Sequence, residues 1–230
     1  MINISRSFNG PPGMGNGGYV CGSLADHIDG PAEVMLKAPC PLDTDLEIVD
    51  HGDHLSLMNG DHEIAVGRAA TPDLRAREPI SFDQAVMASR DFIGFHDHPV
   101  PGCFVCGTDL VEGDGLRIYA GAVAGHDNVV AAPWTPHANH ANEDGVVADR
   151  IMWSALDCPG AFTVTGKPTK PMLLGKLNAQ IFNRPRAGDA CVVQGWKIAQ
   201  EGRKIMTGTA LYGADGGQLA IAHATWILAK

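Results

Sequence analysis

The stretch EGRKIMTGTA at residues 201–210 begins with a Glu-Gly turn and continues as an extended segment with a glycine near its middle. Residues 59–69, NGDHEIAVGRA, have the same layout about 141 positions earlier. Asn-Gly is a strong signal for a hairpin turn, and alternating polar and apolar residues after it indicate a strand. The chain is therefore expected to contain two similar halves, each with a hairpin at this point.

Each half is expected to place one short helix before a set of long strands. Apolar residues four positions apart predict helices at 19–27, after the glycine-rich stretch 10–18, and at 146–156. Strands are expected at 32–38, 46–58, 63–71, 116–124, 128–134, 177–181, 190–198, 204–212 and 218–228. A single helix can be buried only if the sheet wraps around it. The prediction is an α+β fold, a double hot-dog in which two curved antiparallel sheets each wrap a central helix, with a first half plus linker at 1–95 and a second half at 96–230.

Composition excludes several classes of protein. The 230 residues carry a net charge of −9 and contain no block of Lys and Arg that could neutralise phosphates, so nucleic acid is not an expected partner. No apolar run reaches the roughly 18 residues that a membrane helix needs. The first residues lack the pattern of a secretory signal, so a cytoplasmic location with six reduced cysteines is expected.

Three short motifs carry a resemblance to known proteins. Residues 103–107, CFVCG, followed by 113–118, GDGLRI, resemble the CFxCG…GLGLRF opening of phenylacetyl-CoA-thioesterase-like hot-dog proteins. Residues 182–226 resemble the C-terminal half of the double hot-dog acyl-CoA thioesterase II family, and 16–18, NGG, resemble its first helix start. The resemblance implies hydrolysis of an acyl-CoA thioester without a cofactor, and association into a homodimer.

The sequence also departs from these families. The HGG turn of the phenylacetyl branch is Glu143-Asp144-Gly145 here, without the histidine. The Thr and Gln that accompany the thioesterase II aspartate fall on Gly175 and Ala224. The alternative is therefore a non-catalytic hot-dog protein that binds an acyl group or another small ligand.

Thioester hydrolysis requires an activated water and donors that polarise the carbonyl. Asp157, at the end of the second expected helix, is the leading candidate for the carboxylate, and the resemblance places an aspartate there too. Asp26 is its equivalent in the first helix; either residue could instead cap a turn or lie in solvent. Gly18 and Gly145 are expected to offer backbone N–H groups at the two helix starts.

Five further residues are expected to bind substrate. Asn16 and Gly17 precede the first helix, and Asn178 and Gln180 are polar residues on a strand that could alternatively face solvent. Arg184 lies in a weak cluster of basic residues suited to the phosphates of CoA.

One pattern resembles part of a zinc site. His96 and His98, followed by Cys103 and Cys106, have the residue types and spacing of zinc ligands. No second Cys-x-x-Cys or His-x-x-x-His pair completes the set, so no metal is expected.

Overall fold

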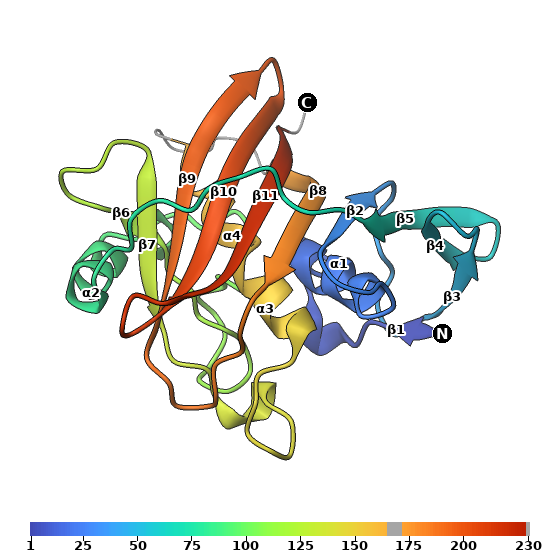
Figure 1. Cartoon of the computed structure of the whole chain (residues 1–230), viewed down its shortest axis with the longest axis horizontal. Coiled ribbons are helices and arrows are strands. Elements are labelled where there is room, and N and C mark those ends of the chain that lie inside the picture. The colour runs from blue at the N-terminus through green and yellow to red at the C-terminus, as the bar shows by residue number, and fades with distance from the viewer. Residues whose placement is uncertain (165–171, 229–230) are drawn as a thin grey trace.

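The computed structural model describes residues 1–164 and 172–228. Its strands pair antiparallel in one sheet, with the order β1-β3-β4-β5-β2-β8-β11-β10-β9-β7-β6 (Figure 1). The strands are β1 Ile2–Asn3, β2 Ala32–Leu36, β3 Asp45–Asp50, β4 Leu55–Asn59, β5 His62–Ala69, β6 Gly121–Ala122, β7 Val129–Trp134, β8 Met172–Ile181, β9 Cys191–Glu201, β10 Lys204–Gly213 and β11 Gln218–Leu228. The α-helices are α1 Gly17–Ala25, α2 Phe82–Arg90, α3 Asp149–Ala155 and α4 Cys158–Ala161, and short 3₁₀ turns lie at Arg6–Phe8, Ile93–Phe95 and Ala138–His140.

The expectation of two separate sheets is wrong, because β2 and β8 join the halves. Val34 of β2 pairs with Leu177 of β8, and Ala32 pairs with Ala179. The physical reason is that an isolated half would leave the N–H and C=O groups of each of these strands unpaired along one edge. Pairing the two edges satisfies those groups and makes one continuous sheet.

The hairpins predicted from the repeat are confirmed. β4 and β5 are joined at Gly60, and β9 and β10 are joined at Gly202, and both glycines have a φ of +57°. A positive φ of this kind is adopted readily by glycine and rarely by other residues, so the turn explains the recurrence of glycine at these two positions.

Helices α1 and α3 pack against each other at two glycines of α1. A Cβ at Gly22 would lie 2.6 Å from Cα of Arg150 and 2.8 Å from Cβ of Trp153. A Cβ at Gly18 would lie 2.6 Å from Cβ of Asp157. The helices can approach this closely only because glycine has no side chain, and the start of α1 is thereby held against the end of α3.

The second expected helix is shorter than predicted. The sequence pattern indicated 146–156, but α3 begins at Asp149, and a separate short helix, α4, begins at Cys158. Residues 142–146 instead form a turn, in which Gly145 has a φ of +77° and donates its N–H to the carbonyl of Asn142. Val146 and Val147 pair in isolated bridges with Arg186 and Ala141, respectively, and Ala148 is extended, so the helix cannot begin before Asp149.

The segment between the halves crosses the outer face of the sheet before α2 (Figure 1). The side chain of Gln194 on β9 accepts a hydrogen bond from the N–H of Ile80 at 3.1 Å and donates to the carbonyl of Glu78 at 3.3 Å. Tyr212 donates its hydroxyl to the carbonyl of Arg77. Ile80 and α2 cover a second apolar cluster that includes Trp196. We call residues 77–80 the strap. Gln194 therefore holds the strap on the sheet through polar contacts.

We expect Gln194→Met to lower the free energy of unfolding by about 2 kcal/mol, because it leaves the buried N–H of Ile80 and the partly buried carbonyl of Glu78 without their partner at nearly unchanged volume. Urea unfolding measures the difference. Gln200→Met, on the exposed end of the same strand, is the matched control and should change stability by less than about 0.5 kcal/mol. An equal effect of the two substitutions would contradict the anchoring role.

Among the helices in the described ranges, none has the length and apolar character needed to cross a membrane.

Candidate active site

Asp157 is a buried carboxylate at the junction of α3 and α4. Its side chain lies against the start of α1, and the residue is 2% exposed. Oδ2 accepts a hydrogen bond from the Gly18 N–H at 2.9 Å and another from the Asn16 side-chain amide at 3.1 Å. Oδ1 is also buried and has no partner within the described residues. Two hydrogen bonds thus fix Oδ2, whereas Oδ1 has no partner in the described part of the chain and could bond to a ligand.

The sequence around Asn16 explains this arrangement. Asn16 is the N-cap of α1, and its Oδ1 accepts the N–H of Tyr19 at 2.9 Å. Asn is among the residues preferred at this position because its short side chain reaches the unpaired N–H groups of the first turn. The cap fixes the Asn16 amide, whose NH₂ group then points to Asp157. The helix dipole adds a favourable field for a negative charge at this end.

Burial dominates the acidity of Asp157. It raises the pKa of the carboxyl to about 7, because desolvation penalises the charged form, whereas the Gly18 N–H and the Asn16 amide act in the opposite direction. A carboxyl group with a pKa near neutrality can accept or release a proton at physiological pH.

A pocket of about 340 Å³ opens beside this carboxylate. Its lining is mostly apolar and includes Val20, Phe162 and Trp226, with Asp157 at its wall. Gly17 also lines the pocket, and no described residue accepts a hydrogen bond from its N–H. The N–H of Gly17 is therefore available to a ligand, whereas the N–H of Gly18, expected to serve as a donor, is already bonded to Asp157.

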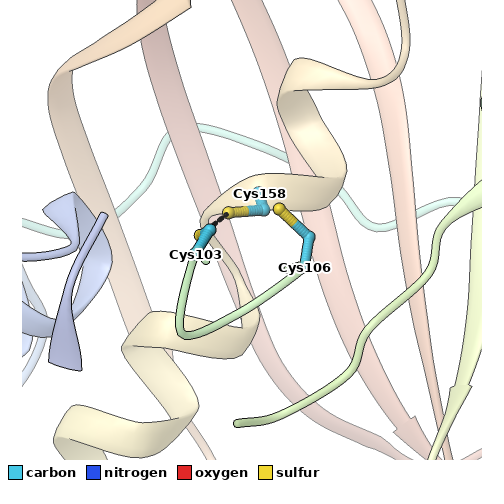
Figure 2. Close-up of side chains that lie close together, drawn as sticks. All are labelled: Cys103, Cys106 and Cys158. Carbon is cyan, nitrogen blue, oxygen red and sulfur yellow. Dashed lines mark hydrogen bonds between the residues drawn. The ribbon is translucent and has the colours of Figure 1, made fainter. Parts of the chain in front are cut away.

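Three buried cysteines form a second feature of the same pocket wall. Cys103 and Cys106 lie on one loop, Cys158 follows Asp157 directly, and the three sulfur atoms all lie within 4.8 Å of one another (Figure 2). The neighbouring thiols of Cys106 and Cys158 hold the pKa of Cys103 well below its usual range. Hydrogen bonding with Cys103 raises the pKa of Cys106 and of Cys158. Such a set could hold a metal ion.

The structure brings together only some of the residues predicted from the sequence. Asn16, Gly17, Gly18 and Asp157 meet at one point, although they are far apart in the sequence. Gly145 is not near them: it lies in the turn described above, and its N–H is used by Asn142.

The remaining predicted residues also lie elsewhere. Asn178 and Gln180 sit on β8 outside the described pocket lining; Asn178 is buried and Gln180 is half-buried. Arg184 pairs with Asp149 at the opposite end of α3 from Asp157. Asp26 is exposed, lies near Arg150 at 3.8 Å, and is not part of the pocket lining.

Two chemically active residues of the pocket, Cys158 and Lys37, were not among those predicted from the sequence. Cys158 is a single cysteine that no local motif marks as a partner of Cys103 and Cys106. Lys37 lines the pocket from the loop after β2 and is exposed. A lone lysine carries no pattern that distinguishes it from a solvated charge.

The fold is that of thioesterase II and related hot-dog proteins, and the resemblance expected from the sequence is confirmed at this level. The chain is similar to a hot-dog protein of unknown function from Alicyclobacillus acidocaldarius (TM-score 0.63, 10% identity, 99% of this chain and 91% of that chain). It is also similar to a candidate thioesterase II from Thermobifida fusca (TM-score 0.59, 13% identity, 100% and 91%). A third such structure is the TesB protein of Mycobacterium avium subspecies paratuberculosis (TM-score 0.59, 9% identity, 96% and 90%). No known protein-family profile matches the sequence, and no curated protein matches it either.

Proposed function

We propose that the chain hydrolyses an acyl-CoA thioester by direct attack of water. The observation that carries the proposal is the position of Asp157: a buried carboxylate with one free oxygen, beside a free N–H at a helix start, on the wall of an apolar pocket. The names of two structural neighbours, a candidate thioesterase II and a TesB protein, support the same class of reaction.

The geometry suggests a role for each group. The Gly17 N–H would donate to the thioester carbonyl oxygen, where negative charge develops during attack. Oδ1 of Asp157 would accept a proton from a water molecule as that water attacks the carbonyl carbon. Collapse of the tetrahedral intermediate breaks the C–S bond, and the thiolate leaves and takes up a proton. The net reaction converts the thioester and water into a carboxylic acid and a thiol.

The lining of the pocket has an apolar part and one cationic side chain, which suit different parts of an acyl-CoA molecule. The apolar lining suits an acyl chain or an aromatic acyl group. Lys37 is the one cationic side chain among the described residues of the lining, and we propose it, rather than Arg184, as the contact for the anionic part of CoA.

The proposal also covers the arrangement of the two halves and the oligomeric state of the chain. The two halves, 1–95 and 96–230, would each correspond to one hot-dog unit of a double hot-dog, and the fused chain would associate further as a homodimer. A cytoplasmic location agrees with the six free cysteines, all of which are buried.

A panel of acyl-CoA substrates of increasing chain length, with phenylacetyl-CoA included, tests the activity when the released thiol is detected with a chromogenic reagent. We expect turnover of at least one member. The absence of thiol release from the whole panel would contradict the proposal.

A second candidate is a non-catalytic binder of acyl groups. It is favoured by Gly175, which lines the pocket where thioesterase II enzymes are expected to have a threonine. In that case an acyl-CoA should raise the melting temperature without release of thiol.

We expect Lys37→Ala to raise KM for acyl-CoA about fivefold, which corresponds to the loss of about 1 kcal/mol from one exposed charge contact. The KM of a truncated acyl-pantetheine substrate, which lacks the nucleotide phosphates, should stay unchanged. Arg184→Ala is the matched control and should leave both values unchanged. The opposite result, an effect of Arg184→Ala alone, would restore the expectation drawn from the sequence.

A further inference from the structure

The sulfur atoms of Cys103, Cys106 and Cys158 converge on one point inside the protein (Figure 2). The residues are 4%, 3% and 7% exposed, and the Sγ atoms of Cys103 and Cys158 are 3.7 Å apart. A zinc ion with Zn–S bonds of about 2.3 Å in tetrahedral geometry holds its sulfur ligands about 3.8 Å apart. The observed spacing is therefore close to that of a zinc–thiolate site.

The loop that carries two of these cysteines is built to aim them in one direction. The Gly107 N–H donates to the carbonyl of Cys103 at 2.8 Å and closes a tight turn. A Cβ at Gly107 would lie 2.5 Å from the carbonyl oxygens of Cys103 and Pro101, so only glycine fits after Cys106. The turn thus places both thiols of the Cys-x-x-Cys pair on the side that faces Cys158.

Unpaired polar atoms lie on the same pocket wall and give an independent indication of a ligand. Oδ1 of Asp157 and Nε2 of His98 are buried without partners among the described residues, and both residues line the pocket that the three cysteines line. The amide of Asn16 lies 3.1 Å from Oδ2 of Asp157 and 3.9 Å from Sγ of Cys103, which links the carboxylate to the cysteine cluster. Buried polar groups normally have hydrogen-bond partners. Two buried polar atoms without partners beside three thiols therefore indicate that a ligand binds here.

We propose that Cys103, Cys106 and Cys158 bind a zinc ion as thiolates, with the fourth coordination position directed to the pocket. Binding needs no oxidant: each coordinated thiol releases its proton to solvent, and the charge of the ion compensates the thiolates that burial would otherwise disfavour. His96 is exposed and takes no part in this arrangement. The inference shares Oδ1 of Asp157 with the proposed hydrolysis but does not depend on turnover, because its ligands are the three thiols.

The binding of zinc is tested on the full-length protein, purified under reducing conditions and equilibrated with zinc before unbound metal is removed. We expect about one zinc per chain by elemental mass spectrometry. Replacement of zinc by cobalt should produce an intense near-ultraviolet absorption from thiolate-to-cobalt charge transfer. This absorption reports sulfur ligands directly in the unsubstituted protein, so the result does not depend on the folding of a variant.

Substitutions then identify the ligands. Cys158→Ser should reduce the bound zinc at least tenfold, to about 0.1 per chain or less. Cys40→Ser is the matched control, because Cys40 is buried and lines the same pocket but is not part of the cluster, and it should retain the metal.

Three results would overturn the inference. These are no zinc in the unsubstituted protein, equal zinc in Cys158→Ser and the unsubstituted protein, or a cobalt-substituted protein without the thiolate-to-cobalt absorption. A protein that binds zinc but hydrolyses no thioester would leave this inference intact and contradict only the proposed function.

Discussion

Asp157→Asn is expected to lower kcat for acyl-CoA hydrolysis by about 10²- to 10⁴-fold, with little change in KM. The amide has the shape of the carboxyl group, and its oxygen can still accept the hydrogen bonds from Gly18 and Asn16. It cannot accept a proton from the attacking water. Thiol release under single-turnover and steady-state conditions measures the loss.

The folded state should survive this substitution. An amide is cheaper to bury than an ionised carboxylate, so the free energy of unfolding of Asp157→Asn should equal or exceed that of the unsubstituted protein. Asp26→Asn is the matched control at the end of the other central helix, and it should retain activity because Asp26 lies outside the described pocket lining. Full activity in Asp157→Asn, or a comparable loss in Asp26→Asn, would refute the assignment.

The site combines elements that come from both halves of the chain. Asn16, Gly17 and Gly18 belong to the start of α1 in the first half, whereas Asp157 and Cys158 lie between α3 and α4 in the second. Neither half contains both the free N–H group and the carboxylate with its available oxygen. The close packing of α1 on α3 is therefore a condition for the proposed chemistry as well as for stability.

The repeat predicted the order of elements but not how the halves join. Hairpin turns depend on local sequence, so Gly60 and Gly202 could be recognised from the residues around them. The pairing of β2 with β8 depends on two strands far apart in the chain, and no local pattern encodes it.

The matching glycines of the repeat also occupy different environments. A Cβ at Gly67 would meet Leu24 and Ile28 beside α1, whereas a Cβ at Gly208 would meet the ring of Trp196. Trp196 belongs to the apolar cluster under the strap, on the other face of the sheet. The two positions match in sequence but face opposite sides, so similarity of pattern does not guarantee equivalence of side-chain direction.

For the candidate site, the predicted residues that lie together at the pocket are those expected at the start of the first helix and the end of the second. Asn16 was selected with the glycines that precede the first expected helix, and Asp157 was selected from its place at the end of the second helix and from the family resemblance. Gly145 was placed at a helix start because the apolar spacing extends back to residue 146, but Val146 and Val147 pair in β-bridges and the helix begins only at Asp149. Cys158 was missed because it approaches Cys103 and Cys106 only through the tertiary fold.

Gly22→Ala is expected to lower the free energy of unfolding by about 3 kcal/mol, although alanine has the higher helix propensity. In an unconstrained helix the same change would stabilise by about 1 kcal/mol. Here the added Cβ would lie 2.6 Å from Cα of Arg150, which is backbone and cannot rotate away, so α1 and α3 must separate. The separation should also lengthen the contact between Gly18 and Asp157 and reduce turnover in the folded protein.

Denaturant unfolding and the rate of thiol release, measured on the same samples, test both effects. Gly102→Ala is the control, because the nearest atom to its added Cβ would be the side-chain nitrogen of Asn9 at 3.5 Å, an ordinary contact distance. That variant should differ from the unsubstituted protein by less than about 0.5 kcal/mol. A stabilised Gly22→Ala would show that the two helices do not touch at this point, and the geometry that aligns the start of α1 with Asp157 would then have to be abandoned.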